Sequence, residues 1–147
     1  MKKRCRVPEP SSEAARKRMQ SVRQQGTKPE LLLRSRLHRM GLRFKVDAAV
    51  LPGVRRRADI VFAGQRVAVF VDGCFWHGCP IHGTWSKSNA EFWRNKIETN
   101  RTRDTDTNRR LAEAGWKVIR VWEHEPLDVA APRIASAVIE RRTRMAR

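Results

Sequence analysis

The sequence lacks several features that would define its class. No apolar run in the 147 residues approaches the length of a membrane span, and no apolar segment follows the basic N-terminus MKKRCRVPEP. We therefore expect neither a membrane anchor nor a secretory signal, and place the protein in the cytoplasm, associated with the nucleoid. There is no internal repeat and no long linker, which favours one domain over residues 11–147 behind a basic flexible arm at 1–10.

Cysteine is also scarce, with only Cys5, Cys74 and Cys79. This odd, uneven set does not form a disulfide framework, and a chain of this length can bury a core without one. Cys5 stands alone in the basic arm, where we expect no role for it. Cys74 and Cys79 lie close together beside histidines, which points to metal.

Acidic residues are few: 15, against 32 lysines and arginines, which gives a formal net charge of +17. So positive a surface attracts polyanions, of which nucleic acid is the commonest. Charge alone does not separate a DNA-binding module from an enzyme. The 40% of hydrophobic residues excludes a chain that is disordered by composition.

The hydrophobic pattern predicts a mixed sheet flanked by helices. We expect helices at 11–23, 28–40, 89–114 and 129–145, and strands at 43–51, 58–62, 66–71 and 116–122. The spacings of Thr27 with Glu30 and of Ser88 with Glu91 predict capping boxes. Gly41 and Gly115 are expected to end their helices. The apolar face of the 28–40 helix is expected to contain Leu31, Leu32, Leu37 and Met40.

The segment VDGCFWHGCPIHG, within a long loop at 72–87, carries the clearest metal-binding pattern. Cys74, Cys79 and His82 supply three zinc ligands, and a closed tetrahedral site needs a fourth. His124, just past the last strand, is the best remote candidate, and His77 is also possible by composition. The alternative is a loop of buried cysteines and ordinary histidines, which is the weaker interpretation for so dense a cluster.

Phe75 and Trp76 lie inside the same loop, and two interpretations stay open for them. They could form a small local core, or they could wedge between base pairs of duplex DNA. Trp93, with Phe92 and Ile97 on one face of the 89–114 helix, is interpreted as a core residue.

Asp59 follows the basic run Arg55, Arg56 and Arg57, and Asp72 ends the next strand. On a hairpin the two carboxylates could converge at one end of the sheet, where they would supply the hard oxygen ligands that Mg²⁺ requires. A solvated aspartate at each strand end is the alternative. His77 could then act as a general base, and Glu30 could contribute although a capping box already explains it.

The sequence resembles the very short patch repair (Vsr) DNA mismatch endonucleases from about Ser12 to Glu123. The densest matching blocks are LPGVRRRADIVF, VFVDGCFWHGCPIHG, EFWRNKI and GWKVIRVWEHE. The resemblance implies a restriction-endonuclease-like fold of the PD-(D/E)XK type. It also implies a magnesium-dependent enzyme that nicks duplex DNA 5′ to a thymine mispaired with guanine, where a 5-methylcytosine has deaminated.

Residue by residue, the resemblance implies a metal-binding aspartate at Asp59, a general base at His77 and a supporting glutamate at Glu30. Phe75 and Trp76 match an intercalating aromatic pair, and Met19 matches an intercalating residue on the N-terminal helix. Trp93 matches a family tryptophan near the mismatch, although packing remains our interpretation of it.

Three positions depart from the best-known members of that family. Asp72 stands in place of a histidine, so a carboxylate there should bind Mg²⁺ directly. His124 replaces a cysteine, which makes Cys74, Cys79, His82 and His124 the expected zinc set. Val71 replaces a threonine, though its backbone carbonyl could still bind metal.

Two other functions remain open at this point. One is a restriction-type nuclease with a different target, and the other is a zinc-stabilised DNA-binding module without catalysis. The second would leave Asp59, Asp72 and His77 without a shared purpose. We expect a monomer, because a mismatch is an asymmetric target.

Overall fold

The computed structural model describes residues 13, 27–74, 79 and 89–146. Apart from Glu13, which is helical, the predicted first helix lies outside the described residues. The described elements are α2 (Lys28–Arg39), β1 (Lys45–Ala49), β2 (Arg57–Phe62), β3 (Val67–Asp72), α3 (Ala90–Glu113), β4 (Lys117–Trp122) and α4 (Leu127–Met145). Every element predicted within this part of the chain is present, with ends shifted by at most two residues.

The four strands form one mixed sheet in the order β1-β2-β3-β4. The pairs β1–β2 and β2–β3 are antiparallel, whereas β3 and β4 are parallel and joined through α3. The predicted hairpin of β2 and β3 is confirmed, and so is the central place of β3, whose residues are nearly all buried. The expected restriction-endonuclease-like mixed α/β fold is therefore observed.

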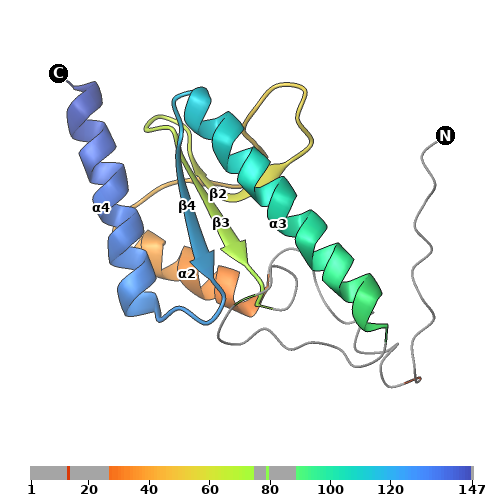
Figure 1. The fold of residues 1–147 in the computed structure, drawn as a ribbon. Coiled ribbons are helices and arrows are strands. Elements are labelled where there is room, and N and C mark those ends of the chain that lie inside the picture. Colours follow the sequence, from red (N-terminus) through yellow and green to blue (C-terminus); the bar gives the residue numbers. More distant parts are fainter. Residues whose placement is uncertain (1–12, 14–26, 75–78, 80–88, 147) are drawn as a thin grey trace.

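Alternation along β3 sends side chains to two different cores, because successive residues of a strand face opposite sides of the sheet. Val67 and Val69 face α2 and α4, while Ala68 and Phe70 face α3 (Figure 1). The first core is larger; its helical part consists of Leu33, Leu37, Ala130, Ala131, Ile134, Ala135 and Val138. The second is small, and Leu111 is its one fully buried residue from α3. The carboxyl ends of β3 and β4 thus lie between a firmly packed layer and a more polar helix.

Glycines end α2 and α3 as the sequence predicts. Gly41 and Gly115 adopt positive φ of 82° and 85°, which costs glycine little. The residue after each glycine donates a hydrogen bond back to the last turn of the helix. The Leu42 N–H donates to the Leu37 carbonyl at 3.1 Å, and the Trp116 N–H donates to the Leu111 carbonyl at 2.9 Å. These closures turn the chain directly into β1 and β4.

Two local predictions about helix starts are wrong. Thr27 is the N-cap of α2 but its side chain makes no capping hydrogen bond, and Glu30 pairs with Arg34 instead. Asn89, in the left-handed region at φ 55°, is the N-cap of α3, again without a side-chain capping bond. Glu30 is only 3% exposed, so the protein holds this carboxylate inside.

The predicted apolar face of α2 is confirmed at Leu37 and wrong at Leu31, Leu32 and Met40. Leu33 and Leu37 are buried, whereas Leu31, Leu32 and Met40 are 43–49% exposed. The i, i+4 pair Leu33 and Leu37 packs on α4 and the sheet, and Glu30 extends the same face toward the sheet end. None of the described helices is long and apolar enough to cross a membrane.

Candidate active site and metal centre

Asp59 lies in β2, next to the central strand of the sheet. Its Oδ2 accepts a hydrogen bond from the backbone N–H of Val71 in β3 at 2.7 Å. This bond fixes the carboxylate against the backbone near the carboxyl end of β3. Within the described residues, no lysine or arginine forms an ion pair with Asp59.

Two further carboxylates lie close enough for their charges to act on Asp59. Glu30, from α2, is bound by the guanidinium of Arg34. Asp72, the last residue of β3, accepts from Arg120 of β4 at 2.9 Å. Glu30 and Asp72 are each paired with an arginine, although Asp72 shares Arg120 with Asp104, whereas Asp59 forms no ion pair within the described chain.

This arrangement raises the pKa of Asp59 from its ordinary value to about 6. Burial is the main cause, because it removes the charged form from water, and the negative charges of Glu30 and Asp72 add to it. The Val71 N–H and the positive charge of Arg34 act in the opposite direction without cancelling the effect. Among the described residues, the Asp59 carboxylate thus has no ion-pair partner that offsets its burial.

A divalent cation is the natural complement of such a cluster. The negative charges of Glu30 and Asp72 act on the carboxylate of Asp59, and hard oxygen ligands are those that Mg²⁺ prefers. The charges of Asp72 and Glu30 both act on Asp59, which supports the expected grouping of Asp59 and Asp72, and that grouping stays a prediction. The residues present therefore fit a magnesium site centred on Asp59.

A second cluster lies just beyond the ends of β3 and β4. Ligand atoms of Cys74, Cys79 and His124 all lie within 4.8 Å of one another. The Nδ1 atom of His124 is 3.1 Å from Sγ of Cys74 and 3.7 Å from Sγ of Cys79. Adjacent S and N ligands of a tetrahedral zinc are about 3.5 Å apart, given the usual Zn–S and Zn–N bond lengths. The three side chains thus fit three corners of a metal site.

Both thiols of this cluster are buried, which disfavours their charged form. Cys74 and Cys79 are 6% and 4% exposed, and burial raises the pKa of the Cys74 thiol well above its ordinary value in the metal-free protein. The thiolate is the form that binds zinc, and a bound ion would stabilise it. Two hydrogen bonds hold the main chain in place here. The Cys74 N–H donates to Glu123 Oε1 at 3.0 Å, and the Glu123 N–H donates to the Asp72 carbonyl at 3.0 Å.

Comparison with known proteins agrees with this geometry. The family model described as DNA mismatch endonuclease Vsr matches residues 11–82. The type II nicking enzyme V.NaeI of Lentzea aerocolonigenes is 43% identical over 133 residues, covering 89% of this chain and 80% of that protein. The type II nicking enzyme V.XorIIP of Xanthomonas oryzae pv. oryzae is 46% identical over 82% of this chain and 88% of its own length. The DNA mismatch endonuclease Vsr of Escherichia coli K12 is 39% identical over 73% of this chain and 67% of its own length.

The chain belongs to the Vsr family. It is therefore a DNA endonuclease of the Vsr type, as the sequence blocks predicted, and the non-catalytic alternative falls away.

Several residues singled out from the sequence lie outside the described residues. These are Met19, Phe75, Trp76, His77 and His82. Their roles as wedge, general base and fourth zinc ligand stay predictions. Trp93 is half-buried and packs edge-on against Phe92, with ring centroids 5.1 Å apart, while Ile97 of the same helix is 5% exposed.

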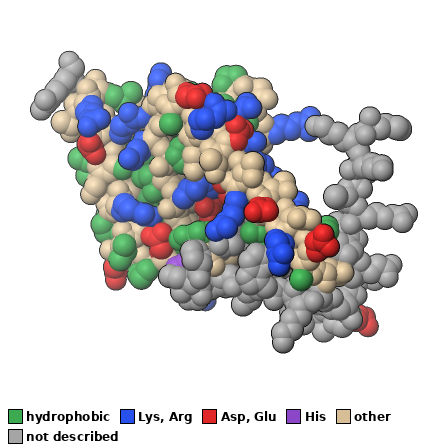
Figure 2. All heavy atoms as spheres, viewed as in Figure 1, with side chains coloured by type: hydrophobic (Ala, Val, Ile, Leu, Met, Phe, Trp, Pro, Cys, Tyr) green, Lys and Arg blue, Asp and Glu red, His purple; other side chains and the backbone are tan. Residues whose placement is uncertain are grey.

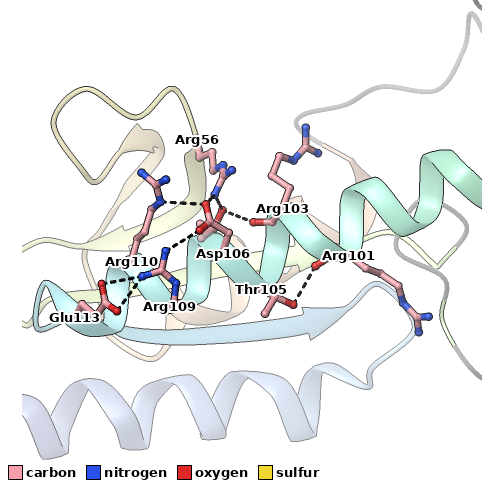
Figure 3. A network of polar contacts seen from close by, with 9 residues as sticks. Arg56, Arg101, Arg103, Thr105, Asp106, Arg109, Arg110 and Glu113 are labelled. Carbon is pink, nitrogen blue, oxygen red and sulfur yellow. Dashed lines mark hydrogen bonds and ion pairs between the residues drawn. The ribbon is translucent and has the colours of Figure 1, made fainter. Parts of the chain in front are cut away.

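The three arginines before Asp59 are not equivalent. Arg56 donates to Asp106 of α3 at 2.8 Å and to Thr107 at 2.6 Å, and Figure 3 shows it reaching the helix from the loop before β2. Its hydrogen bond, followed by that of Arg109, lowers the pKa of Asp106 to about 2. Arg57 pairs with Asp47 of β1 at 3.0 Å. Arg55 is exposed and forms no ion pair within the described chain.

The structure therefore predicts different outcomes for neighbouring arginines. Arg55→Ala should leave thermal stability unchanged and reduce by about one the slope of log binding constant for DNA against log salt concentration. Arg56→Ala should lower the free energy of unfolding by about 1–2 kcal/mol, because Asp106 and the buried Thr107 lose a charged partner. Urea unfolding and salt-dependent DNA binding of both variants check this. Equal effects of the two substitutions on both quantities would contradict it.

The rest of the visible surface is basic without being segregated. Figure 2 shows Lys and Arg side chains spread over this face with acidic side chains among them. The single carboxylate of Asp106, on α3, forms ion pairs with Arg56, Arg109 and Arg110. Part of the positive charge on this helix, that of Arg109 and Arg110, is thus paired with acidic residues of the same helix.

Sequence analysis missed Arg34 and Arg120, the two counterions of the cluster. Arg34 had a readable signal, since it lies four residues after Glu30 on a helix. Arg120 had a subtler one: it is the single charge in the apolar strand segment VIRVW. Neither signal shows which carboxylate would lie opposite.

Proposed function

We propose that this Vsr-family endonuclease nicks one strand of duplex DNA 5′ to the thymine of a T·G mismatch, and so initiates very short patch repair of deaminated 5-methylcytosine. The observation that carries the catalytic part is the buried carboxylate of Asp59, which forms no ion pair within the described residues and lies under the negative charges of Glu30 and Asp72. The names of the relatives, a mismatch endonuclease and nicking enzymes, support the target and the single-strand cut.

In the proposed reaction Asp59 and Asp72 hold Mg²⁺, and Glu30 supports the site from α2. The ion, when bound, stabilises charge on the phosphate and on the leaving oxygen. Arg34 and Arg120 restrain the outer carboxylates, so the unbalanced charge stays at Asp59. His77, five residues beyond the end of β3, takes a proton from the attacking water.

We further propose that Cys74, Cys79, His82 and His124 hold a structural zinc. The ion would fasten the segment that carries Phe75, Trp76 and His77 to the end of β4, because two of the ligands flank that segment. A catalytic segment held at both ends can present its side chains to DNA in one arrangement.

Phe75 and Trp76 are proposed as the wedge that gives the enzyme its target. Unstacking a base step costs a few kcal/mol, and it costs less at a mismatch than in matched DNA. Phe75→Ala combined with Trp76→Ala should therefore reduce the ratio of T·G to T·A nicking rates by about tenfold or more while thermal stability is retained. Met19→Ala should have the same direction and a smaller effect. Unchanged discrimination in a folded double variant would show that the pair is a local core instead.

A restriction-type nuclease of different target choice is the remaining alternative. Single-turnover nicking of a T·G duplex, compared with T·A and C·G duplexes of otherwise identical sequence, separates the two. The proposal expects the T·G duplex to be cut at least about a hundredfold faster, a discrimination of roughly 3 kcal/mol. Equal rates on the matched duplexes would favour the alternative. We expect a monomer throughout, which sedimentation of the DNA-bound enzyme can check.

A further inference from the structure

Arg120 is a charged residue inside the sheet. It lies in β4 between Ile119 and Val121, which are 7% and 4% exposed and face α2 and α4. Alternation turns Arg120 to the other side, toward α3, where its side chain keeps 20% exposure. A guanidinium at such a place must be paired, because burying an unpaired charge is costly.

The guanidinium is held from several sides. Its Nη1 donates to Asp72 Oδ1 at 2.9 Å and its Nε to Asn108 Oδ1 at 2.8 Å. Asp104 is 3.5 Å from the same Nη1, and the guanidinium carbon is 4.4 Å from the ring centroid of Phe70. The planar guanidinium of Arg120, which belongs to β4, thus contacts both β3 and α3. The ammonium group of a lysine could not reproduce this set of contacts.

The pairing follows from strand register. Phe70 lies opposite Arg120 and Asp72 opposite Trp122 in the parallel β3–β4 ladder. Phe70 and Asp72 are two residues apart, so both face the α3 side. The arginine stacks on the first and reaches the second, which holds the Asp72 carboxylate at the end of β3, near Asp59.

We propose that Arg120 is a positioning residue for the nicking reaction: it fixes the Asp72 carboxylate beside Asp59 and balances its charge. The proposal rests on the proposed function, in which Asp59 and Asp72 hold Mg²⁺. It assigns to Arg120 two separable effects, one on geometry and one on charge.

The two effects have opposite signs in a Mg²⁺ titration. Without the guanidinium, which pairs with both Asp72 and Asp104, the site loses one positive charge and attracts a divalent cation more strongly. Without the hydrogen bond from the guanidinium, the Asp72 carboxylate loses its fixed position, so the complex of enzyme, DNA and Mg²⁺ reacts more slowly. Arg120 as a mere structural brace would lower thermal stability and leave the Mg²⁺ dependence unchanged.

The test is a double-mutant cycle of Arg120→Met and Asp72→Asn, with Arg120→Lys as the conservative variant. Single-turnover nicking of a T·G duplex is measured against Mg²⁺ concentration. We expect Arg120→Met to lower the maximal rate by roughly 10- to 100-fold, as misplaced catalytic groups do, and to lower the half-saturating Mg²⁺ concentration several-fold. Arg120→Lys should keep the wild-type half-saturation and recover only part of the rate.

The proposal is decided by whether the effects of Arg120→Met and Asp72→Asn depend on each other. Asp72→Asn alone should raise the half-saturating Mg²⁺ concentration, and adding Arg120→Met should bring it back toward the wild-type value with little further loss of rate. The double variant removes Arg120 together with its nearest carboxylate, so it should be more stable than Arg120→Met, even though Asp104 also loses its contact with Arg120. Multiplicative losses of rate, or an unshifted Mg²⁺ dependence in every Arg120 variant, would overturn the proposal.

Arg36→Met is the matched control. Arg36 of α2 pairs with Asp128 of α4 at 2.6 Å, joining two elements and carrying the same charge, but with 38% exposure. Its loss should leave both the maximal rate and the Mg²⁺ dependence unchanged. A wild-type enzyme without Mg²⁺-dependent nicking would refute the proposed function itself, whereas normal wild-type nicking with uncoupled variants refutes only the role of Arg120.

Discussion

Replacing Asp59 by asparagine should abolish nicking, with a loss of at least about a thousandfold in single-turnover rate. The substitution keeps the size of the side chain and an oxygen that can accept a hydrogen bond from the Val71 N–H. In the wild type this N–H is 2.7 Å from the Asp59 carboxylate. The substitution removes the one carboxylate charge of Glu30, Asp59 and Asp72 that forms no ion pair with a described arginine. DNA binding should persist or tighten, because a negative charge near phosphate is gone. Nicking and binding assays on one T·G duplex measure both quantities.

The same variant should be more stable than the wild type in the absence of metal. Burial raises the pKa of Asp59 to about 6, so the charged form is disfavoured in the folded state. The wild type is thus relatively most stable below the unfolded pKa, near 4, and loses that contribution as pH rises through about 6. Asp59→Asn should recover about 1–3 kcal/mol at pH 7.5 in EDTA, and less at pH 5.

Added Mg²⁺ gives an independent comparison of the two proteins. It should raise the melting temperature of the wild type and not that of Asp59→Asn, because a ligand stabilises only the fold that binds it. Wild-type nicking rates in Asp59→Asn, or an equal Mg²⁺ effect on both melting temperatures, would exclude Asp59 as the metal ligand.

Loss of a zinc ligand is the second change expected to have a large effect. Cys74→Ala should reduce the zinc content from about one per chain to well below one and lower the free energy of unfolding by at least about 3 kcal/mol, because metal binding contributes directly to folding. The buried thiol of Cys79 and the imidazole of His124 would lose their shared partner. Nicking should fall with it, since the segment carrying His77 would be held at one end less firmly.

Cys5→Ala is the control for this experiment. It removes a thiol far along the chain from the cluster and should change neither zinc content nor stability. Elemental analysis and urea unfolding of the three proteins give the comparison. Purified wild-type protein that is stable, active and free of zinc would show that Cys74, Cys79 and His124 form no zinc site.

Periodicity and turn residues sufficed to predict the fold of the described chain. The alternation in β3 and the positive-φ glycines 41 and 115 are local features, and local features are legible in sequence. The face of α2 was misjudged because Leu31, Leu32 and Leu33 are consecutive, and only the packing against α4 selects Leu33. Such a selection is a tertiary effect and has no local signature.

The site residues also divide into those that local sequence features predict and those that only the tertiary structure reveals. Asp59, Asp72, Cys74, Cys79 and His124 were predicted from residue type and spacing, and the structure brings them into two adjacent clusters. The pairing of Asp72 with Arg120 could not be predicted, because it depends on the parallel register of strands separated by the whole of α3. Glu30 was assigned to a helix cap because the spacing fits one, whereas burial beside Arg34 gives it a different role.

Strand-resolved cleavage of a T·G duplex tests the central claim most directly. The two strands carry different fluorescent labels, and the wild-type enzyme is mixed with the duplex in single turnover with Mg²⁺ or with EDTA. The account predicts one product, a cut 5′ to the mispaired thymine in the strand that contains it, formed only with Mg²⁺. Cleavage that persists in EDTA, cuts both strands, or proceeds equally well on the T·A duplex would contradict it.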